Sequence, residues 1–380
     1  MSTARAPDRL APGATIGILG GGQLGRMLAM AAAKLGLKCH VYAPEPDAAA
    51  FEVVRRVTLA EYGDENALDG FARDVDVVTY EFENVPSEVA TFLNSRRPVL
   101  PAPSVLATTQ DRLVEKTFVA GLGIATAPFA SADTVTQTAA ALAEIGRPAV
   151  LKTRRFGYDG KGQATVWPDT DLDAAWQQIG GRPAVVERFI DFEREISVVA
   201  ARDRGGHVVC FEVTENEHRD HVLKISRVPA DIPAELGVEA RRIAERIAGA
   251  LDYVGVLAVE MFVVKDAHAR TVLVNEIAPR VHNSGHWTLD GASVSQFEQH
   301  IRAIAGWPLA KPRRRGRIEM INLIGAEVED YARWLKVDGA AVHLYGKANM
   351  RPGRKMGHVT RVFCDASEQD RSPRPHRRKG

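Results

Sequence analysis

Short apolar segments in the first part of the chain are separated by stretches with helical spacing. Residues 15–19 predict a strand, followed by a glycine-rich turn and by a helix that Gly36 ends. Residues 38–42 and 75–80 predict two further strands. Alternating strands and helices are typical of a parallel sheet with crossover helices. The pattern therefore predicts a first domain with a Rossmann-like parallel sheet, over residues 1–107.

The middle of the chain predicts a smaller second domain, over residues 108–191. A charged helix around residues 111–116 opens it, and strands at residues 148–152 and 184–187 flank a glycine-rich loop. A third domain, over residues 192–365, is rich in predicted strands. They lie at residues 195–200, 207–214, 255–264 and 271–275, with a helix around residues 240–251. Residues 366–380 are polar and basic, so we expect a disordered tail, and a solvated end without a role is favoured over contact with nucleic acid.

Composition excludes several classes of protein. A chain of 380 residues, 45% hydrophobic and 26% charged, is an ordinary globular composition. The net charge of +1 gives no global field to attract nucleic acid or a membrane, and no uncharged apolar run is long enough to span a bilayer. Cys39, Cys210 and Cys364 are scattered and lack metal-ligand spacing, which predicts reduced thiols in a cytoplasmic protein.

The segment from Gly20 to Gly25 matches the dinucleotide fingerprint GxGxxG in its strand-to-helix context. A hydride-transfer enzyme is therefore a competing class. Glu45 and Asp47 lie near the place where an acid would bind a ribose hydroxyl, but they stand between prolines. Glycines also let a helix N-terminus approach any phosphate, so the motif alone does not decide the ligand.

Lys152 ends a strand and precedes a loop with three glycines and Lys161. Backbone N–H groups and ammonium groups together suit a flexible cover over phosphates, although a surface hairpin has the same composition. Glu187 and Glu195 lie at strand ends, where adenosine recognition competes with ordinary solvated carboxylates.

Glu260 and Glu276 each interrupt a strongly apolar strand. If the two strands are antiparallel neighbours, both carboxylates meet at one point, where they repel unless a cation lies between them. Oxygen ligands with room for phosphate oxygens suit Mg²⁺, and an ion pair with Lys or Arg is the alternative. The residues that follow, 277–287, place Arg280 and His282 among many other polar groups, which indicates an active site because burying them unpaired is costly.

These motifs, in this order, resemble those of the ATP-grasp ligases. Residues 20–26, 157–163, 275–287 and 351–358 resemble more narrowly the carboxyaminoimidazole ribonucleotide synthetases of purine biosynthesis, over about residues 14–362. The resemblance implies an α/β fold in which a Rossmann-like domain precedes a two-lobed ATP-grasp unit. It also implies ATP and one or two Mg²⁺ ions as cofactors, aminoimidazole ribonucleotide and bicarbonate as substrates, and a cytoplasmic homodimer without nucleic acid or membrane partners.

The resemblance also implies roles for single residues. Those expected at ATP are Arg112, Lys152, Gly157, Tyr158, Asp159, Gly160, Lys161, Gly162, Gln163, Glu187, Arg188, Phe189, Ile190, Glu195, His218, Asn275 and Glu276. Those expected at the ribonucleotide are Gln23, Leu24, Glu83, Tyr158, Asn283, Lys347, Arg354 and Lys355, and the expected catalytic residues are Arg280, His282, Asp159 and Lys161. Glu260, Glu276 and Asn275 are expected to bind Mg²⁺.

The implied reaction is carboxylation of the ribonucleotide amine by bicarbonate that ATP has activated as carboxyphosphate. Two alternatives remain: another ATP-grasp ligase, such as a formate-using glycinamide ribonucleotide enzyme, and an NAD-dependent dehydrogenase. Lys347, Arg354 and Lys355 have the chemistry and spacing of a phosphate-binding clamp without reference to the resemblance. A solvated basic loop without a ligand is the alternative interpretation of these residues. The chain departs from the resemblance after Val362, where it continues into the basic tail.

Overall fold

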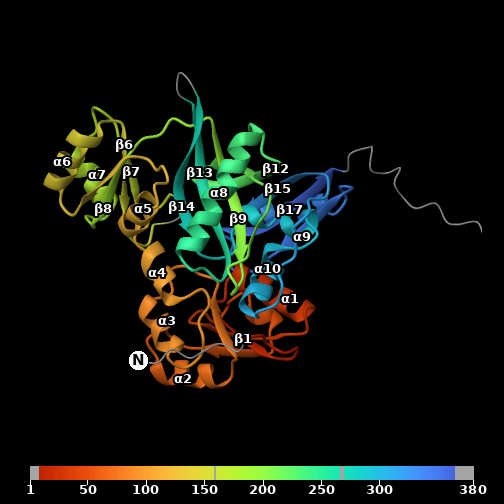
Figure 1. Cartoon of the computed structure of the whole chain (residues 1–380). Helices are drawn as coiled ribbons and strands as arrows, with labels where there is room; N and C mark the ends of the chain where they lie inside the picture. Colours follow the sequence, from red (N-terminus) through yellow and green to blue (C-terminus); the bar gives the residue numbers. More distant parts are fainter. Residues whose placement is uncertain (1–7, 158–159, 266–268, 364–380) are drawn as a thin grey trace, which may run out of the picture.

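The computed structural model describes residues 8–157, 160–265 and 269–363. Three sheets organise these residues (Figure 1). Among the described residues, no helix is long and apolar enough to cross a membrane.

The first sheet is parallel, in the order β3-β2-β1-β4. Its β1 strand is buried along most of its length, as the apolar segment predicts. Both neighbours of β1 run in the same direction, so the carboxyl ends of β1 and β4 meet at one edge. The elements of this part are β1 (Thr15–Leu19), α1 (Gln23–Lys34), β2 (Lys38–Ala43), η1 (Phe51–Val53), β3 (Arg56–Leu59), α2 (Glu65–Arg73), β4 (Val77–Tyr80), α3 (Ser87–Asn94) and α4 (Pro103–Thr109).

The second sheet is antiparallel, in the order β5-β8-β6-β7, and has a separate apolar core. It stands apart from the rest of the molecule in Figure 1, and we call it the lid sheet. The helix that precedes it, α5, begins where Asp111 accepts hydrogen bonds from the first backbone N–H groups. The elements here are α5 (Arg112–Gly121), β5 (Phe129–Ala132), α6 (Val135–Ile145), β6 (Ala149–Thr153), β7 (Gln163–Val166), α7 (Leu172–Gln178) and β8 (Ala184–Arg188).

The third sheet is the largest and is antiparallel, in the order β14-β13-β9-β11-β12-β15-β17-β16, with β10 paired to β9. Strands near the end of the described chain, β15 and β17, therefore extend the sheet that β9 and β13 begin. Its strands are β9 (Arg194–Arg202), β10 (Val208–Cys210), β11 (Thr214–Arg219), β12 (Val222–Val228), β13 (Gly255–Lys265), β14 (Arg270–Ala278), β15 (Arg317–Ile324), β16 (Ala340–Leu344) and β17 (Lys355–Phe363). The accompanying helices are α8 (Ala234–Ala250), η2 (Asn283–Gly285), α9 (Thr288–Gly291), α10 (Gln296–Ile304), η3 (Gly325–Asp330) and α11 (Tyr331–Trp334).

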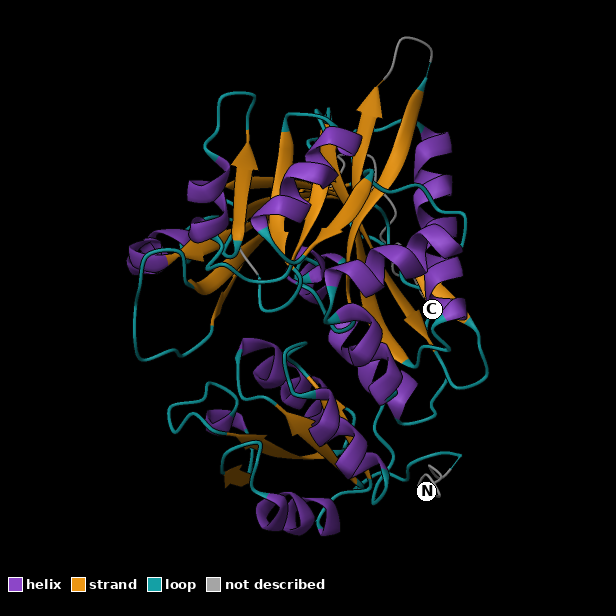
Figure 2. Cartoon of the chain, turned by 90° about the vertical axis from the view of Figure 1, so that its left-hand side faces the viewer, coloured by secondary structure: helices purple, strands orange, loops and turns teal. Residues whose placement is uncertain are grey.

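The first and third sheets share one apolar core. Ile16 and Leu28 from the first part pack in the same cluster as Val256, Trp287 and Phe297. In Figure 2 the parallel sheet and its helices lie directly below the large sheet. This packing fixes the end of β4 beside the loop that follows β14, where the polar sequence motifs lie.

The sequence predicted most of these elements but not all. Helix α8 begins at Ala234, earlier than predicted, because Pro233 precedes its first turn. The single strand predicted at residues 207–214 is wrong: the structure has a short strand β10 and a separate strand β11 that begins at Thr214. The fold class is confirmed, while the domain boundaries at residues 107, 191 and 365 stay predictions.

Candidate active site

A buried carboxylate, that of Glu81, occupies the anion-binding position of the glycine-rich turn. Its Oε1 accepts the N–H of Gly22 (2.8 Å) and its Oε2 accepts the N–H of Gly25 (3.1 Å). Burial raises the pKa of Glu81, and these N–H groups and Arg280 oppose that rise. Gly20 has a φ of +98°, and a Cβ there would lie 2.7 Å from Oε1 of Glu81. The glycines therefore accommodate an internal carboxylate, and the N–H groups that would receive a pyrophosphate are already used.

Glu83, two residues after Glu81, forms an ion pair with Arg280 from the loop after β14. Nη2 of Arg280 donates to Oε1 of Glu83 (2.7 Å), and Nε of Arg280 donates to Oε2. The arginine holds the pKa of Glu83 below its ordinary value although burial opposes this. A residue expected at the ribonucleotide and an expected catalytic residue are thus in direct contact. Gln23 and Leu24 begin α1 between Gly22 and Gly25, whose N–H groups donate to Glu81, so they belong to the same edge.

The two strand-borne glutamates face each other, as the sequence predicted. Glu260 of β13 pairs in register with Glu276 of β14, at a bulge in the ladder. Burial and the neighbouring Glu276 raise the pKa of Glu260. Burial also acts on Glu276, but Arg112 and Lys152 outweigh it and lower the pKa of Glu276. The two carboxyl groups therefore differ: Glu276 favours its ionised form, and Glu260 needs a further cation to stabilise its ionised form.

This donor set fits Mg²⁺. In the described contacts, Glu276 uses Oε2 for Arg112 (2.8 Å) and Glu260 uses Oε1 for His282 (3.1 Å). Within residues 8–157, 160–265 and 269–363, no group of three or more His, Cys, Asp or Glu side chains is arranged to hold a metal ion. A pair of carboxylates suits an ion that takes its remaining ligands from water and from substrate phosphates, as Mg²⁺ does.

Cations gather next to the glutamate pair. Lys152, at the end of β6, lies 3.1 Å from Oε2 of Glu187 and 3.5 Å from Oδ1 of Asn275. Burial lowers the pKa of Lys152, and Glu187 counteracts this. Lys116 of α5 lies 3.1 Å from the same oxygen of Glu187. Burial opposes ionisation of Glu187, but the two lysines dominate and lower the pKa of that carboxyl.

The glycine-rich loop joins the paired strands β6 and β7 as a hairpin, and its role as a cover over phosphates stays a prediction. Lys152 and Gln163 are register partners where β6 and β7 flank the loop. Gly160 has a φ of +78°, and a Cβ there would lie 2.6 Å from Cβ of His221 in the β11–β12 turn. Nη2 of Arg112 donates to the carbonyl of Gly157 (3.3 Å). The loop, with exposed Lys161 and with Gly162, thus reaches from the lid sheet to the large sheet; Tyr158 and Asp159 lie outside the described residues.

His218 of β11 pairs with Glu195 of β9 through its Nδ1. Burial alone would lower the pKa of His218, but the contact with Glu195 raises it. The segment after Glu187 lies on the lid side: Arg188 donates to the carbonyl of Ile145, and Phe189 packs against Trp167. Ile190 follows the end of β8.

His282 is held as a neutral imidazole with a defined tautomer. Burial, Arg280 and Lys355 lower its pKa to about 3. The backbone N–H of Ser284 donates to its Nδ1 (3.3 Å), so Nε2 carries the proton and donates to Glu260. The side chain amide of Asn283 exchanges two hydrogen bonds with that of Asn322 (3.0 and 2.6 Å) and is buried. Asn283, expected at the substrate, therefore uses its amide within the protein in this structure.

The basic residues of the predicted phosphate clamp divide into two groups. Lys355, at the start of β17, acts on His218, Glu260 and His282 electrostatically, which places it at the site. Nζ of Lys347 donates to the carbonyl of Lys355 (2.8 Å). Arg354 likewise donates to a backbone carbonyl, that of Asn349.

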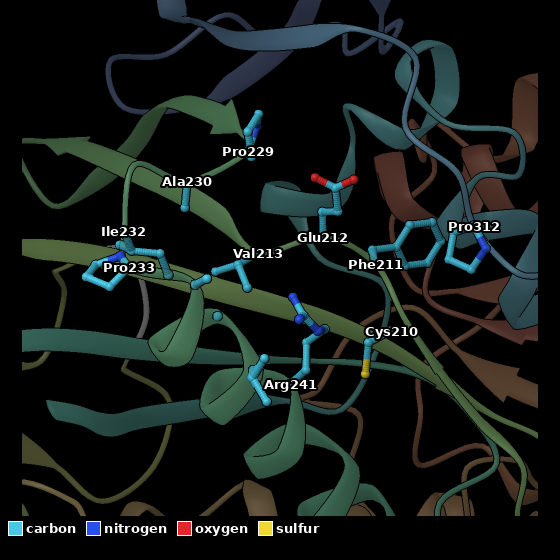
Figure 3. Close-up of a pocket in the computed structure, with 13 residues that line it drawn as sticks. Cys210, Phe211, Glu212, Val213, Pro229, Ala230, Ile232, Pro233, Arg241 and Pro312 are labelled. Carbon is cyan, nitrogen blue, oxygen red and sulfur yellow. The ribbon is translucent and has the colours of Figure 1, made fainter.

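A separate hollow of about 500 Å³ lies beside β10 and the start of α8 (Figure 3). Apolar side chains such as Val213 and Ile232 line it, together with Glu212, Arg241 and Cys210. It contains none of the residues expected at the site. Burial raises the pKa of the Cys39 and Cys210 thiols to about 12, which fits unreactive free cysteines.

Sequence reasoning missed three residues that organise the site. Glu81 is invisible in a GxGxxG motif because the motif does not say which anion the glycines receive. Lys116 is one charge in a charged helix, and its burial depends on how α5 packs against β8 and β14. Asn322 lies in β15, a strand that was not predicted. Of the three, only Glu81 carried a signal, an acidic residue directly after a buried strand.

The parallel first domain, the antiparallel lid sheet, and the paired glutamates beside buried lysines define an ATP-grasp enzyme. Three family models match the chain: a ribonucleotide synthetase preATP-grasp domain over residues 13–110, an ATP-grasp domain over 117–297, and a phosphoribosylaminoimidazole carboxylase C-terminal domain over 319–372. The chain belongs to the N5-carboxyaminoimidazole ribonucleotide synthase family.

Three relatives illustrate the similarity. The N5-carboxyaminoimidazole ribonucleotide synthase of Brucella melitensis is 49% identical, over 93% of this chain and 97% of the relative. The crystal structure of the synthetase from Thermus thermophilus is 46% identical, with a TM-score of 0.85 over 93% of this chain and 94% of that one. The Aspergillus clavatus enzyme, solved with ADP and 5-aminoimidazole ribonucleotide, is 28% identical, with a TM-score of 0.86 over 94% and 96%.

Proposed function

We propose that the chain catalyses the ATP- and bicarbonate-dependent carboxylation of 5-aminoimidazole ribonucleotide to N5-carboxyaminoimidazole ribonucleotide, with release of ADP and phosphate, in purine biosynthesis. Family membership supports the reaction. The observation that carries the proposal is the convergence of the Glu260–Glu276 pair, the buried cations and the Glu83–Arg280 ion pair at one place. This arrangement offers a site for a nucleoside triphosphate beside a site for a small anion.

ATP is expected between the lid sheet and the large sheet. Arg112, Lys152 and the glycine-rich loop with Lys161 bind the phosphates, the backbone of residues 187–190 contacts adenine, and Glu195 with His218 contacts the ribose. Glu260, Glu276 and Asn275 would hold one or two Mg²⁺ ions, which neutralise charge on the transferring phosphoryl group when bound.

The first step makes bicarbonate electrophilic. A bicarbonate oxygen attacks the γ-phosphorus, the bond from that phosphorus to the β,γ-bridging oxygen breaks, and ADP leaves with the electron pair. The product, carboxyphosphate, has phosphate as its leaving group in place of hydroxide. Arg280 is expected to hold bicarbonate, and the Nε2–H of His282 is expected to orient it.

The second step joins the amine to carbon. The exocyclic amine of the ribonucleotide attacks the carboxyl carbon, or the CO₂ released from it, and the C–O bond to phosphate breaks while the amine loses a proton. Gln23, Leu24 and Glu83 would hold the imidazole and ribose, and Lys347, Arg354 and Lys355 the 5′-phosphate. The glycine-rich loop excludes water from an intermediate that hydrolyses readily. Asp159 and Tyr158, expected on that loop, stay predictions outside the described residues.

The test is phosphate release from Mg-ATP, measured with bicarbonate, with and without the ribonucleotide. Release that needs all three substrates is expected, together with loss of release in Glu276→Gln. Release with formate and glycinamide ribonucleotide in their place would favour the other ligase. A cytoplasmic homodimer stays a prediction from the resemblance, and light scattering of the purified chain tests the dimer.

A further inference from the structure

Lys116 is a lysine that the proposed reaction does not use, yet it is almost completely buried, with 2% of its surface exposed. Its Nζ lies 3.1 Å from Oε2 of Glu187 in β8 and donates to the carbonyl of Asn275 in β14 (3.2 Å). A buried ammonium is costly unless its partners compensate for lost hydration, so its position needs a reason. Its two partners belong to the lid sheet and to the large sheet, on either side of the nucleotide site.

The carboxylate that Lys116 contacts is shared with Lys152. Oε2 of Glu187 lies 3.1 Å from Nζ of both lysines. The other oxygen, Oε1, is buried and has no hydrogen-bond partner among the described residues. One negative charge therefore has two counter-ions. In addition, Lys152 lies beside Asn275, at the strand that carries Glu276.

This excess of counter-ions has a consequence for nucleotide binding. When Lys152 turns toward a phosphate group, its contact with Glu187 weakens. Without a second cation, Glu187 would become a buried, uncompensated carboxylate, which is strongly destabilising. With Lys116 in place, Glu187 keeps a counter-ion while Lys152 moves.

We propose that Lys116 is a positioning residue for the polyphosphate of ATP: it neutralises Glu187, so that the ammonium of Lys152 is available to the phosphates. The inference rests on the proposed role of Lys152. Lys116 itself is not expected to touch the nucleotide, because it is buried and its Nζ already contacts Glu187 and the carbonyl of Asn275.

The test compares ligands with and without phosphates. Isothermal titration measures the dissociation constants of adenosine and of the non-hydrolysable β,γ-imido analogue of ATP, the latter with Mg²⁺. The proteins are the intact chain, Lys116→Met, Glu187→Gln, the double variant and Lys152→Met. Lys34→Met is the matched control, because Lys34 lies on the distant helix α1 and is paired with Glu298 (2.9 Å).

Lys116→Met is expected to weaken binding of the analogue at least about tenfold and that of adenosine less than about threefold, because the lost cation acts through the phosphate contacts. Since Glu187→Gln removes the charge that needs compensation, the double variant should bind the analogue within about threefold of Glu187→Gln alone. Lys34→Met should bind both ligands as the intact chain does.

Equal weakening for adenosine and the analogue would assign Lys116 a structural role only and overturn the inference, as would an unchanged affinity. If Lys116→Met does not fold, the double variant is compared with Glu187→Gln alone. A difference of tenfold or more between their dissociation constants for the analogue contradicts the inference. Lys152→Met tests the underlying function separately: an unchanged affinity for the analogue there would remove the proposed role of Lys152 itself.

Discussion

The ion pair between Glu83 and Arg280 joins the parallel domain to the large sheet, so the substitution Glu83→Gln tests both stability and chemistry. The side chains of Arg280 and Glu83 are 16% and 23% exposed, so both are largely desolvated. Glutamine keeps one acceptor for the guanidinium but removes the counter-charge, leaving Arg280 as a mostly buried, unpaired cation.

The size of the effect follows from this geometry. Breaking a fully buried pair costs about 3–5 kcal/mol, and the retained hydrogen bond and partial exposure reduce this to roughly 2–3 kcal/mol. For a chain of 380 residues, the unfolding entropy is about 0.8 kcal/mol/K, so we expect a fall in melting temperature of roughly 3–4 °C. Since Arg280 is expected to hold bicarbonate, the KM for bicarbonate should rise on the order of tenfold, with a smaller change in the KM for ATP.

The assay combines thermal unfolding with steady-state phosphate release at varied bicarbonate. Glu88→Gln is the matched control, because Glu88 is an acid in the first turn of the neighbouring helix α3 and lies outside the site. If Glu83→Gln has the melting temperature of the intact chain and the same KM for bicarbonate, the ion pair has no role in positioning Arg280 for bicarbonate.

Three further substitutions test other parts of the account. Burial and the neighbouring Glu276 raise the pKa of Glu115 from 4.5 to about 8, so the intact chain loses folding stability as the pH rises through that interval. Glu115→Gln should therefore gain stability relative to the intact chain between pH 5 and pH 8.5, measured by denaturant unfolding at both values. A stability difference that is the same at both pH values would contradict this. Glu276→Gln should lower ATP turnover on the order of 100-fold and raise the Mg²⁺ concentration required, measured by Mg²⁺ titration of phosphate release. Gly25→Ala would place a Cβ 2.9 Å from the carbonyl oxygen of Gly20, so it should cost about 1–3 kcal/mol and raise the KM for the ribonucleotide; a KM that does not change would separate the turn from the substrate.

The part of the site that the sequence predicted is the part that local pattern determines. Glu260 and Glu276 each interrupt an apolar strand, and antiparallel pairing of neighbouring strands was enough to bring them opposite each other. Lys152 was predicted near a strand end because it directly follows the apolar residues 149–151, which lie in β6.

The remaining contacts depend on packing between distant segments, which periodicity does not describe. Glu81 fills the glycine turn because β4 lies beside β1. Lys355 reaches the site because β17 joins the large sheet through β15. The partner of Arg280 was not predictable because Glu83 follows a strand of the first sheet. The partner of Asn283 was not predictable because Asn322 lies in β15, a strand that the sequence analysis did not predict.

The central claim is that ATP activates bicarbonate by accepting one of its oxygens at the γ-phosphorus. The most direct measurement supplies bicarbonate labelled with ¹⁸O, together with Mg-ATP and 5-aminoimidazole ribonucleotide, and analyses the released phosphate by mass spectrometry. The account predicts transfer of a single labelled oxygen from bicarbonate to each phosphate. Phosphate without label, released at the rate at which the carboxylated product forms, would contradict it.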